Sequence, residues 1–231
     1  MLKIIALICA RGGSKGIKNK NLLKLNGHSL LAHSILIAKK IKLIKSIYVS
    51  TDSKKISNEA KKYGAAVPFL RPKIFANDSS PEIYAWRHAV TFLKNNINLS
   101  PDYIVSIPAT SPLRKPIDII NAINKAKITN ADIVFAITPS SKNPYFNMVI
   151  NKNKLSIICK KKLYHNRQKA PTCFDITTVC YVFKPNYIME NLDLFSGKTS
   201  SVIIPKERSI DIDTKFDFKI ATLLAKNNYN K

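Results

Sequence analysis

The residues with the clearest chemistry lie in a glycine-rich, cationic segment near the start of the chain. It reads Arg-Gly-Gly-Ser-Lys-Gly over residues 11–16, and Lys20 follows shortly after. Glycine lets a backbone approach a ligand closely, and Arg, Lys and exposed N–H groups bind phosphate oxygens. The segment fits neither the P-loop pattern nor the dinucleotide-binding pattern. It therefore predicts a polyphosphate site of another kind, neutralised by Arg11, Lys15 and Lys20, or else a basic turn that binds no ligand.

Two aspartates near the other end of the chain have the spacing of metal ligands. Asp211 and Asp213 alternate with Ile210 and Ile212, so an extended backbone would place both carboxylates on one side, about 7 Å apart. Carboxylates this close repel each other unless a cation or hydrogen-bond donors lie between them. Their hard oxygens suit Mg²⁺ or Mn²⁺ bound to substrate phosphates. The pattern predicts a divalent-metal site, and the alternative is an acidic turn that caps the last helix.

Regular secondary structure must position these residues. The apolar run at residues 4–10 is too short for an amphipathic helix and is typical of a buried strand in a parallel sheet. Beyond it, strands and helices are expected to alternate, which predicts an α/β fold: a Rossmann-like three-layer sandwich with a mostly parallel sheet. Ligands of such sheets bind beyond the carboxyl ends of the strands. Strands are expected at 47–50, 65–69, 103–107 and 132–137, and helices at 29–40, 53–63, 81–94 and 116–127.

The pattern changes near residue 145. A β-hairpin is expected at 148–158, followed by a basic loop at 160–169, so residues 145–170 are predicted to form an inserted arm. No linker or repeat divides the chain, and a single domain is predicted for residues 1–231. The remaining expected elements are strands at 179–183 and 201–204 and a closing helix at 217–225.

Composition limits the class of protein. With 231 residues, 45% of them hydrophobic, the chain can bury a sizeable core. A net charge of +24 suits an anionic partner and makes nucleic-acid binding through the basic loop an alternative function. Only six of the 38 basic residues are arginine, and the lysines are spread along the chain, which argues against that alternative. Four scattered cysteines suit a reducing cytoplasm, and no stretch is long enough to span a membrane.

The glycine-rich segment, with Ala10 before it and Lys20-Asn21 after it, resembles the nucleotide-binding signature of the acylneuraminate cytidylyltransferases. These are the CMP–sialic acid synthetases and their relatives for other acidic sugars. Other segments resemble the family's remaining motifs, in the same order, over nearly the whole chain. They are Ser50-Thr51-Asp52, Arg71-Pro72 with Ala76-Asn77-Asp78, Thr110-Ser111-Pro112-Leu113-Arg114, Arg167-Gln168 and Ile210-Asp211-Ile212-Asp213-Thr214.

The resemblance implies an enzyme that joins CTP to an acidic 2-keto-3-deoxy sugar, such as sialic acid or a related nonulosonate, and releases pyrophosphate. It implies Mg²⁺ or Mn²⁺ held by Asp211 and Asp213, and a homodimer in which the 145–170 arm reaches the partner's site. The nucleotide would contact Ala10, Arg11, Gly12, Gly13, Ser14, Lys15, Asn21, Arg71 and Asp78, and the sugar would contact Thr110, Ser111, Arg167, Gln168 and Thr177.

Several positions depart from the family pattern. Pro108 stands where the family has a glutamine that holds the sugar, Ala109 replaces a proline, Thr177 replaces an asparagine, and Pro81 and Glu82 stand where small hydroxyl residues lie near the base. Pro108 and Thr177 bear on the identity of the sugar acid, so a Kdo-type or other NTP-sugar nucleotidyltransferase remains an alternative. Asp52 is expected to cap the helix that follows it.

Overall fold

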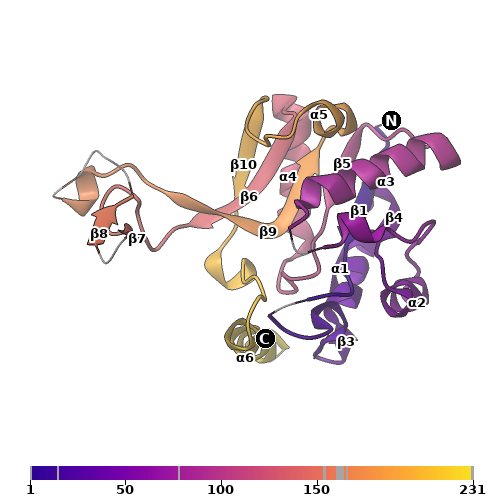
Figure 1. The fold of residues 1–231 in the computed structure, drawn as a ribbon, viewed down its shortest axis with the longest axis horizontal. Coiled ribbons are helices and arrows are strands. Elements are labelled where there is room, and N and C mark those ends of the chain that lie inside the picture. Colours follow the sequence, from indigo (N-terminus) through magenta and orange to yellow (C-terminus); the bar gives the residue numbers. More distant parts are fainter. Residues whose placement is uncertain are drawn as a thin grey trace.

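The structure is a computed structural model that describes residues 2–14, 16–77, 79–152, 155–159, 164 and 166–229. A six-stranded sheet forms its centre (Figure 1). The strands are β1 (Ile4–Cys9), β4 (Ile44–Ser50), β5 (Tyr103–Ser106), β6 (Ile133–Pro139), β9 (Phe174–Phe183) and β10 (Thr199–Ile203).

The strands lie in the order β10–β6–β9–β5–β1–β4. β1 pairs in parallel with β4 and β5, and β10 pairs in parallel with β6. β9 runs antiparallel between β5 and β6. The predicted α/β fold with a mostly parallel sheet is confirmed.

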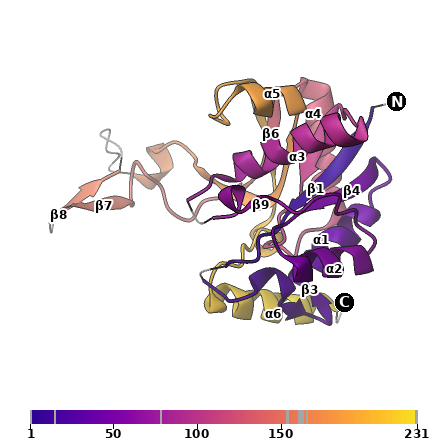
Figure 2. The same cartoon turned by 45° about the vertical axis from the view of Figure 1, so that its right-hand side comes forward.

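Helices cover both faces of this sheet (Figures 1 and 2). α1 (Leu30–Lys39), α2 (Lys54–Lys62) and α4 (Pro116–Thr129) pack on one face. α3 (Glu82–Ile97) and α5 (Pro185–Glu190) pack on the other. The expected helices are therefore present, and α5, which is only six residues long, is one that the sequence patterns did not indicate.

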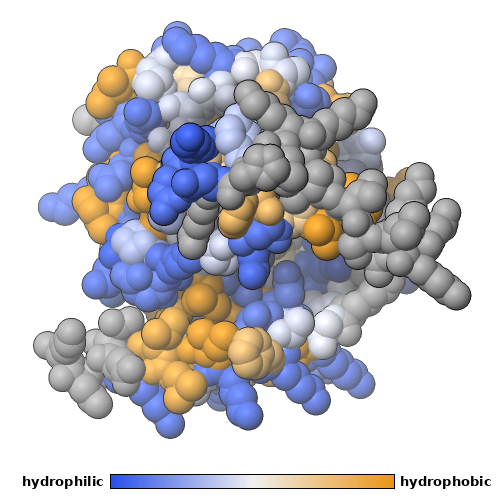
Figure 3. All heavy atoms as spheres, turned by 90° about the vertical axis from the view of Figure 1, so that its left-hand side faces the viewer, coloured by the Kyte–Doolittle hydropathy of each residue, from blue (hydrophilic) through white to orange (hydrophobic). Residues whose placement is uncertain are grey.

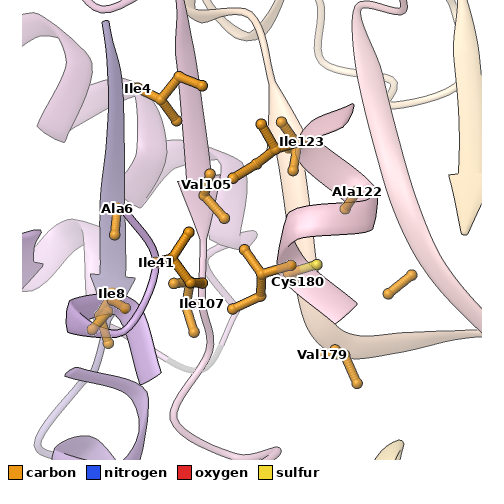
Figure 4. Packing of buried hydrophobic residues seen from close by; sticks show 14 of the residues in the cluster. Ile4, Ala6, Ile8, Ile41, Val105, Ile107, Ala122, Ile123, Val179 and Cys180 are labelled. Carbon is orange, nitrogen blue, oxygen red and sulfur yellow. The ribbon is translucent and has the colours of Figure 1, made fainter. Parts of the chain in front are cut away.

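The alternation of side chains along β1 separates two hydrophobic cores. Ile4, Ala6 and Ile8 belong to the core beneath α1, α2 and α4, whereas Ile5 and Leu7 belong to the core beneath α3. All five are at most 2% exposed, as a strand covered on both faces requires. Figure 4 shows part of the first core, in which side chains of α4 lie over the strands.

A third, smaller core joins the two ends of the chain. α6 (Lys215–Tyr229) contributes Ala221 and Ala225, which pack with Leu30 at the start of α1 and with Ile212. Ile17, just after the glycine-rich segment, is partly buried against the same cluster. Packing therefore brings the glycine-rich segment and the aspartate segment together.

The expected strand at 65–69 is absent. Only isolated bridges form there, from Ala66 to Tyr48 and from Leu70 to Thr51. Pro68 interrupts the run and has no N–H to donate to a ladder. The prediction of a strand at this place is wrong.

A hairpin lies where the arm is predicted. β7 (Val149–Lys152) and β8 (Leu155–Ile158) form a two-stranded antiparallel sheet of their own. The first residues of β9 pair with the end of β6, from Phe174 with Pro139 to Ile176 with Ile137, and this ribbon carries the hairpin away from the body (Figures 1 and 2). Most of the basic loop, residues 160–163 and 165, lies outside the described residues. Over the described part of the chain, no helix is long and apolar enough to cross a membrane.

Candidate functional site

A cleft of about 520 Å³ lies beyond the carboxyl ends of β1 and β5. Its lining combines segments that are far apart in the sequence: the glycine-rich loop, the loop before α3 with the first turn of that helix, the turn after β5, β9 and the aspartate segment. The described lining residues are Cys9, Arg11, Ser14, Gly16, Lys20, Asn21, Arg71, Phe75, Asn77, Ser80, Glu82, Ala85, Pro108, Ala109, Thr110, Thr178, Asp211 and Asp213.

Hydrogen bonds on both sides hold the glycine-rich loop. The Asn21 amide donates from Nδ2 to the Arg11 carbonyl oxygen at 3.0 Å, and Asn21 is buried. The Gly12 N–H donates to Asp52 Oδ1 at 2.8 Å. Ser53, rather than Asp52, caps α2, because its hydroxyl accepts from the Ile56 N–H. The expectation that Asp52 is the helix cap is wrong, and the carboxylate instead orients the loop.

The aspartate segment is fixed to the turn after β5. The Ile212 N–H donates to the Thr110 carbonyl oxygen at 2.9 Å, and the Ile212 side chain is fully buried. Asp211 and Asp213 both line the cleft on the opposite side. Thr214 caps α6, because its hydroxyl accepts from the Asp217 N–H at 3.2 Å and the Asp217 carboxylate in turn accepts from the Thr214 N–H at 2.7 Å. The two cleft aspartates are therefore not needed as helix caps.

The two predicted motifs meet through an ion pair. Lys20 Nζ lies 2.7 Å from Asp213 Oδ1, although the residues are 193 positions apart. Asp211 differs, because its Oδ1 is buried and finds no hydrogen-bond partner among the described residues. A buried carboxylate oxygen without a donor is costly unless a ligand completes it.

Gly16 marks the closest approach of the two motifs. A Cβ at this position would overlap the carbonyl oxygen of Asp213, whereas a Cβ at Gly13 would meet nothing within 4 Å. We expect Gly16→Ala to push the loop from the aspartate segment and to lower kcat/KM for pyrophosphate release by roughly 10- to 100-fold.

Gly13→Ala is the matched control, since it adds the same methyl group to the same loop without a clash. Steady-state kinetics of both variants test the prediction. Equal activities for the two would show that the contact between Gly16 and Asp213 does not set the geometry of the cleft.

Arg71 and Glu82 form another wall. Arg71 is only 6% exposed. Its backbone N–H donates to the Thr51 carbonyl oxygen at 2.7 Å, whereas its side-chain Nε is buried without a partner in the described structure. Glu82 is the first residue of α3 and is open to the cleft. The protein around the cleft raises the pKa of Glu82 and Asp211 adds to this rise, whereas Trp86 and Arg71 lower the pKa. The side chain is exposed in the open cleft, so water reduces the rise and the carboxyl stays ionised at neutral pH.

Hydroxyl groups line the side near the turn after β5. The hydroxyls of Ser111 and Thr178 lie 2.6 Å apart, and Thr110 Oγ1 donates to Thr178 Oγ1 at 3.4 Å. Thr178 lines the cleft, but Thr177 points into the protein and donates to the Ala136 carbonyl oxygen at 3.2 Å. Neighbouring residues of a strand face opposite sides, so the structure places Thr178, and not the predicted Thr177, beside the cleft.

The other predicted contact residues are dispersed. Ala10 is buried in the core and Gly13 is exposed. Neither residue is among the described residues that line the cleft, whereas Arg11 and Ser14 are. Arg167 and Gln168 lie in a 3₁₀ turn of the arm (Arg167–Lys169) and are not among the described lining residues. Lys15 and Asp78 lie outside the described residues.

Several residues that line the cleft belong to no motif that could have been recognised in the sequence. Phe75 and Ser80 come from the loop before α3, and Cys9 ends β1. Burial raises the pKa of the Cys9 thiol to about 12, so this cysteine stays neutral and is a poor nucleophile.

Comparison with known proteins agrees with this geometry. A family model described as cytidylyltransferase matches residues 5–223. The chain is 37% identical to a CMP-N,N'-diacetyllegionaminic acid synthase of Campylobacter jejuni, over 97% of this chain and 95% of the relative. It is 35% identical to post-translational flagellin modification protein B of Campylobacter coli, over 98% and 96% of the two chains. A solved CMP:2-keto-3-deoxy-manno-octonic acid synthetase complexed with CTP shares the fold, with a TM-score of 0.76 at 12% identity, over 98% of this chain and 99% of that chain.

Proposed function

Because this chain belongs to the cytidylyltransferase family and is therefore a nucleotidyltransferase that uses CTP, we propose that it activates an acidic 2-keto-3-deoxy sugar of the nonulosonate class. The anomeric hydroxyl of the sugar attacks the α-phosphate of CTP, the bond to the β-phosphate breaks, and CMP-sugar and pyrophosphate are formed. The observation that carries the proposal is the meeting of the glycine-rich loop and the aspartate segment across one cleft.

The cationic side chains of the loop have roles that follow from charge. Arg11 and Lys20 line the cleft, and we assign them to the triphosphate, where negative charge builds on the leaving pyrophosphate. We assign Lys15 the same role from the sequence alone. Asn21 holds the Arg11 carbonyl, and this contact supports a fixed loop backbone that need not reorganise during the reaction.

Asp211 and Asp213 suit a divalent cation. Asp211 offers a buried carboxylate oxygen without a donor, and both residues present hard oxygens to the cleft. Within the described residues there is no group of three or more His, Cys, Asp or Glu that could hold a metal, so the remaining ligands would be phosphate oxygens and water. Bound Mg²⁺ or Mn²⁺ would neutralise phosphate charge and lower the pKa of a hydroxyl beside it.

Among nonulosonates, we propose a diacetyllegionaminate-type sugar. The 37% identical relative is named for that reaction, and the alignment covers nearly all of both chains. The hydroxyls of Thr110 and Thr178 offer donors and acceptors for a polyhydroxylated acid at the turn after β5. Pro108 lines the same part of the cleft and has no side-chain amide, which fits a sugar other than sialic acid.

We further propose a cytoplasmic homodimer formed through the arm. Apolar side chains on the arm and its base are exposed: Met148 by 39%, Val149 by 60%, Phe174 by 40% and Ile176 by 45%. Figure 3 looks onto this side of the molecule, and a second apolar area lies below, on α6. Surfaces of this kind commonly mark subunit contacts. Arg167 would then reach the partner's sugar carboxylate, for which its planar fork is suited. The four cysteines are free thiols, in keeping with a reducing compartment.

Pyrophosphate release tests the proposal directly. We expect Mg²⁺- and CTP-dependent release with N,N'-diacetyllegionaminate, and weaker or no release with pseudaminate, N-acetylneuraminate and Kdo. Release with Kdo alone would replace the proposed sugar class. No release, no stabilisation by CTP and salt-sensitive binding of RNA would instead support the nucleic-acid alternative.

A further inference from the structure

Glu82 is an unexpected residue in a cleft that binds a polyphosphate. Its carboxylate repels phosphate, and among the described residues the groups that favour its charged form are Trp86 and Arg71. The other carboxylates of the cleft, Asp211 and Asp213, suit a cation, but Glu82 belongs to a different segment, at the start of α3. Water solvates this carboxylate in the open cleft, but a bound ligand that excludes the water must present a donor to it, or binding is unfavourable.

The surroundings of Glu82 suit a flat ring. Phe75 lines the cleft from the loop before α3, and Ala85, one turn after Glu82, lines it with only a methyl group. The buried guanidinium of Arg71 lies close enough to lower the pKa of Glu82, and its Nε has no partner within the described chain. This part of the cleft therefore combines an apolar surface, one acceptor and one donor group.

The start of α3 is rigid, which a selective contact requires. Trp86 is 2% exposed and stacks on Phe183 of β9 with ring centroids 4.8 Å apart. Ile83 is also buried in the same core. The backbone of Glu82 is thus held by packing on the sheet, and only its side chain projects into the cleft.

Glu82 can accept hydrogen bonds and Arg71 can donate them, and this combination distinguishes cytosine from uracil. Cytosine carries an exocyclic amino donor at N4 and acceptors at N3 and O2, whereas uracil carries an acceptor at O4 and a donor at N3. A carboxylate accepts from the cytosine amino group but repels O4 of uracil, and a guanidinium donates to N3 or O2 of cytosine. Purines present different edges and a larger ring.

We propose that Glu82 is a specificity-determining residue that accepts a hydrogen bond from the exocyclic amino group of cytosine, while Arg71 donates to the ring acceptors. The inference rests on the proposed function, because it concerns the nucleotide of that reaction. It assigns the selection of CTP over UTP to the side chains of Glu82 and Arg71.

Two other roles for Glu82 make different predictions. As an acid in the first turn of α3, it would stabilise the helix dipole and have no effect on nucleotide choice. As a general base, it would act on the sugar hydroxyl, so its loss would lower kcat equally for every nucleotide.

The test measures kcat/KM for CTP and for UTP by pyrophosphate release, with the sugar acid that the wild-type enzyme accepts. We expect Glu82→Gln to lower the CTP-to-UTP ratio by roughly 10- to 100-fold, because a glutamine amide can turn its NH₂ toward O4 of uracil. Glu82→Asp keeps the charge and the helix-dipole interaction but withdraws the carboxylate, so we expect it to lose CTP activity without gaining UTP activity.

Glu190→Gln is the matched control, because Glu190 ends α5 and lines a different cavity, away from the cleft. Thermal shifts with CTP and UTP report nucleotide binding independently of turnover. An unchanged CTP-to-UTP ratio in Glu82→Gln, or an equal loss of kcat for both nucleotides, would overturn this inference while leaving the proposed function intact. Absence of CTP binding and turnover in the wild type would overturn both.

Discussion

Replacing Asp211 with asparagine is expected to reduce pyrophosphate release on the order of 10³-fold while leaving the protein at least as stable as the wild type. The side chain keeps its shape but loses the charge that suits a cation beside the phosphates. Oδ1 is buried without a hydrogen-bond partner in the described structure, so no such contact offsets the cost of burying this charge in the ligand-free fold. Turnover and stability should therefore respond differently, which distinguishes a ligand-binding carboxylate from a structural one.

The measurements are steady-state kinetics and thermal unfolding, each with and without Mg²⁺ and CTP. In the variant, the additional stabilisation that Mg²⁺ gives in the presence of CTP should be lost. Asp102→Asn is a suitable control, because Asp102 accepts from the Lys3 N–H at 2.6 Å, immediately before β5 and so at the opposite end of that strand from the cleft. Normal turnover in Asp211→Asn would contradict the metal assignment, and a large loss of stability would assign the residue a structural role.

Replacing Arg114 with methionine is expected to lower the free energy of unfolding by about 3–4 kcal/mol, or the melting temperature by roughly 6–15 °C. Arg114 is 3% exposed, and burial lowers the pKa of its guanidinium to about 10, so it remains charged at neutral pH. It donates to Ser34 Oγ at 2.7 Å, to the Thr178 carbonyl oxygen at 3.2 Å and to the Pro108 carbonyl oxygen. Methionine fills similar space but supplies none of these donors, although the Pro108 carbonyl oxygen keeps the Ser34 hydroxyl as a donor at 3.1 Å.

Denaturant unfolding of two further variants separates charge from geometry. Arg114→Lys retains the charge but cannot reach all three acceptors, so an intermediate loss is expected. Arg87→Met is the control for an arginine with a single carbonyl contact, to Ile188 at 2.7 Å, and should cost about 1 kcal/mol. If Arg114→Met were no more destabilising than Arg87→Met, the three hydrogen bonds of Arg114 would not make the expected contribution to the free energy of unfolding.

The elements that were predicted correctly are those in which local pattern and tertiary environment agree. The continuous apolar run at the start of the chain is buried on both faces, and Ser29 caps α1 by accepting from the Ala32 N–H at 3.1 Å. Residues 65–69 have strand composition, but Pro68 prevents a continuous ladder. The antiparallel direction of β9 could not be predicted, because it depends on the chain returning from the arm rather than on any residue in the strand.

For the site, the sequence indicated which segments matter but not which atoms meet. The alternation at 210–213 predicted that both aspartates share one side of the segment, and in the structure both line the cleft while Ile212 between them is buried. The exchange of Thr177 for Thr178 is a shift of one residue along β9, and sequence alone does not fix which face of a strand is buried. Asp52 has the position of a helix cap, and only the fold reveals that its carboxylate instead reaches the Gly12 N–H.

The ion pair between Lys20 and Asp213 makes the two substrate-side charges of the cleft interdependent. In this structure each residue neutralises the other across 2.7 Å. In the proposed reaction, a phosphate bound to Lys20 would leave Asp213 with an uncompensated negative charge and so raise its affinity for a cation, and a cation on Asp213 would release Lys20 for a phosphate. Linkage is reciprocal, so we expect CTP and the divalent ion each to strengthen the binding of the other by the same factor. The pair thus disfavours either ligand alone and favours their arrival as one neutralised complex.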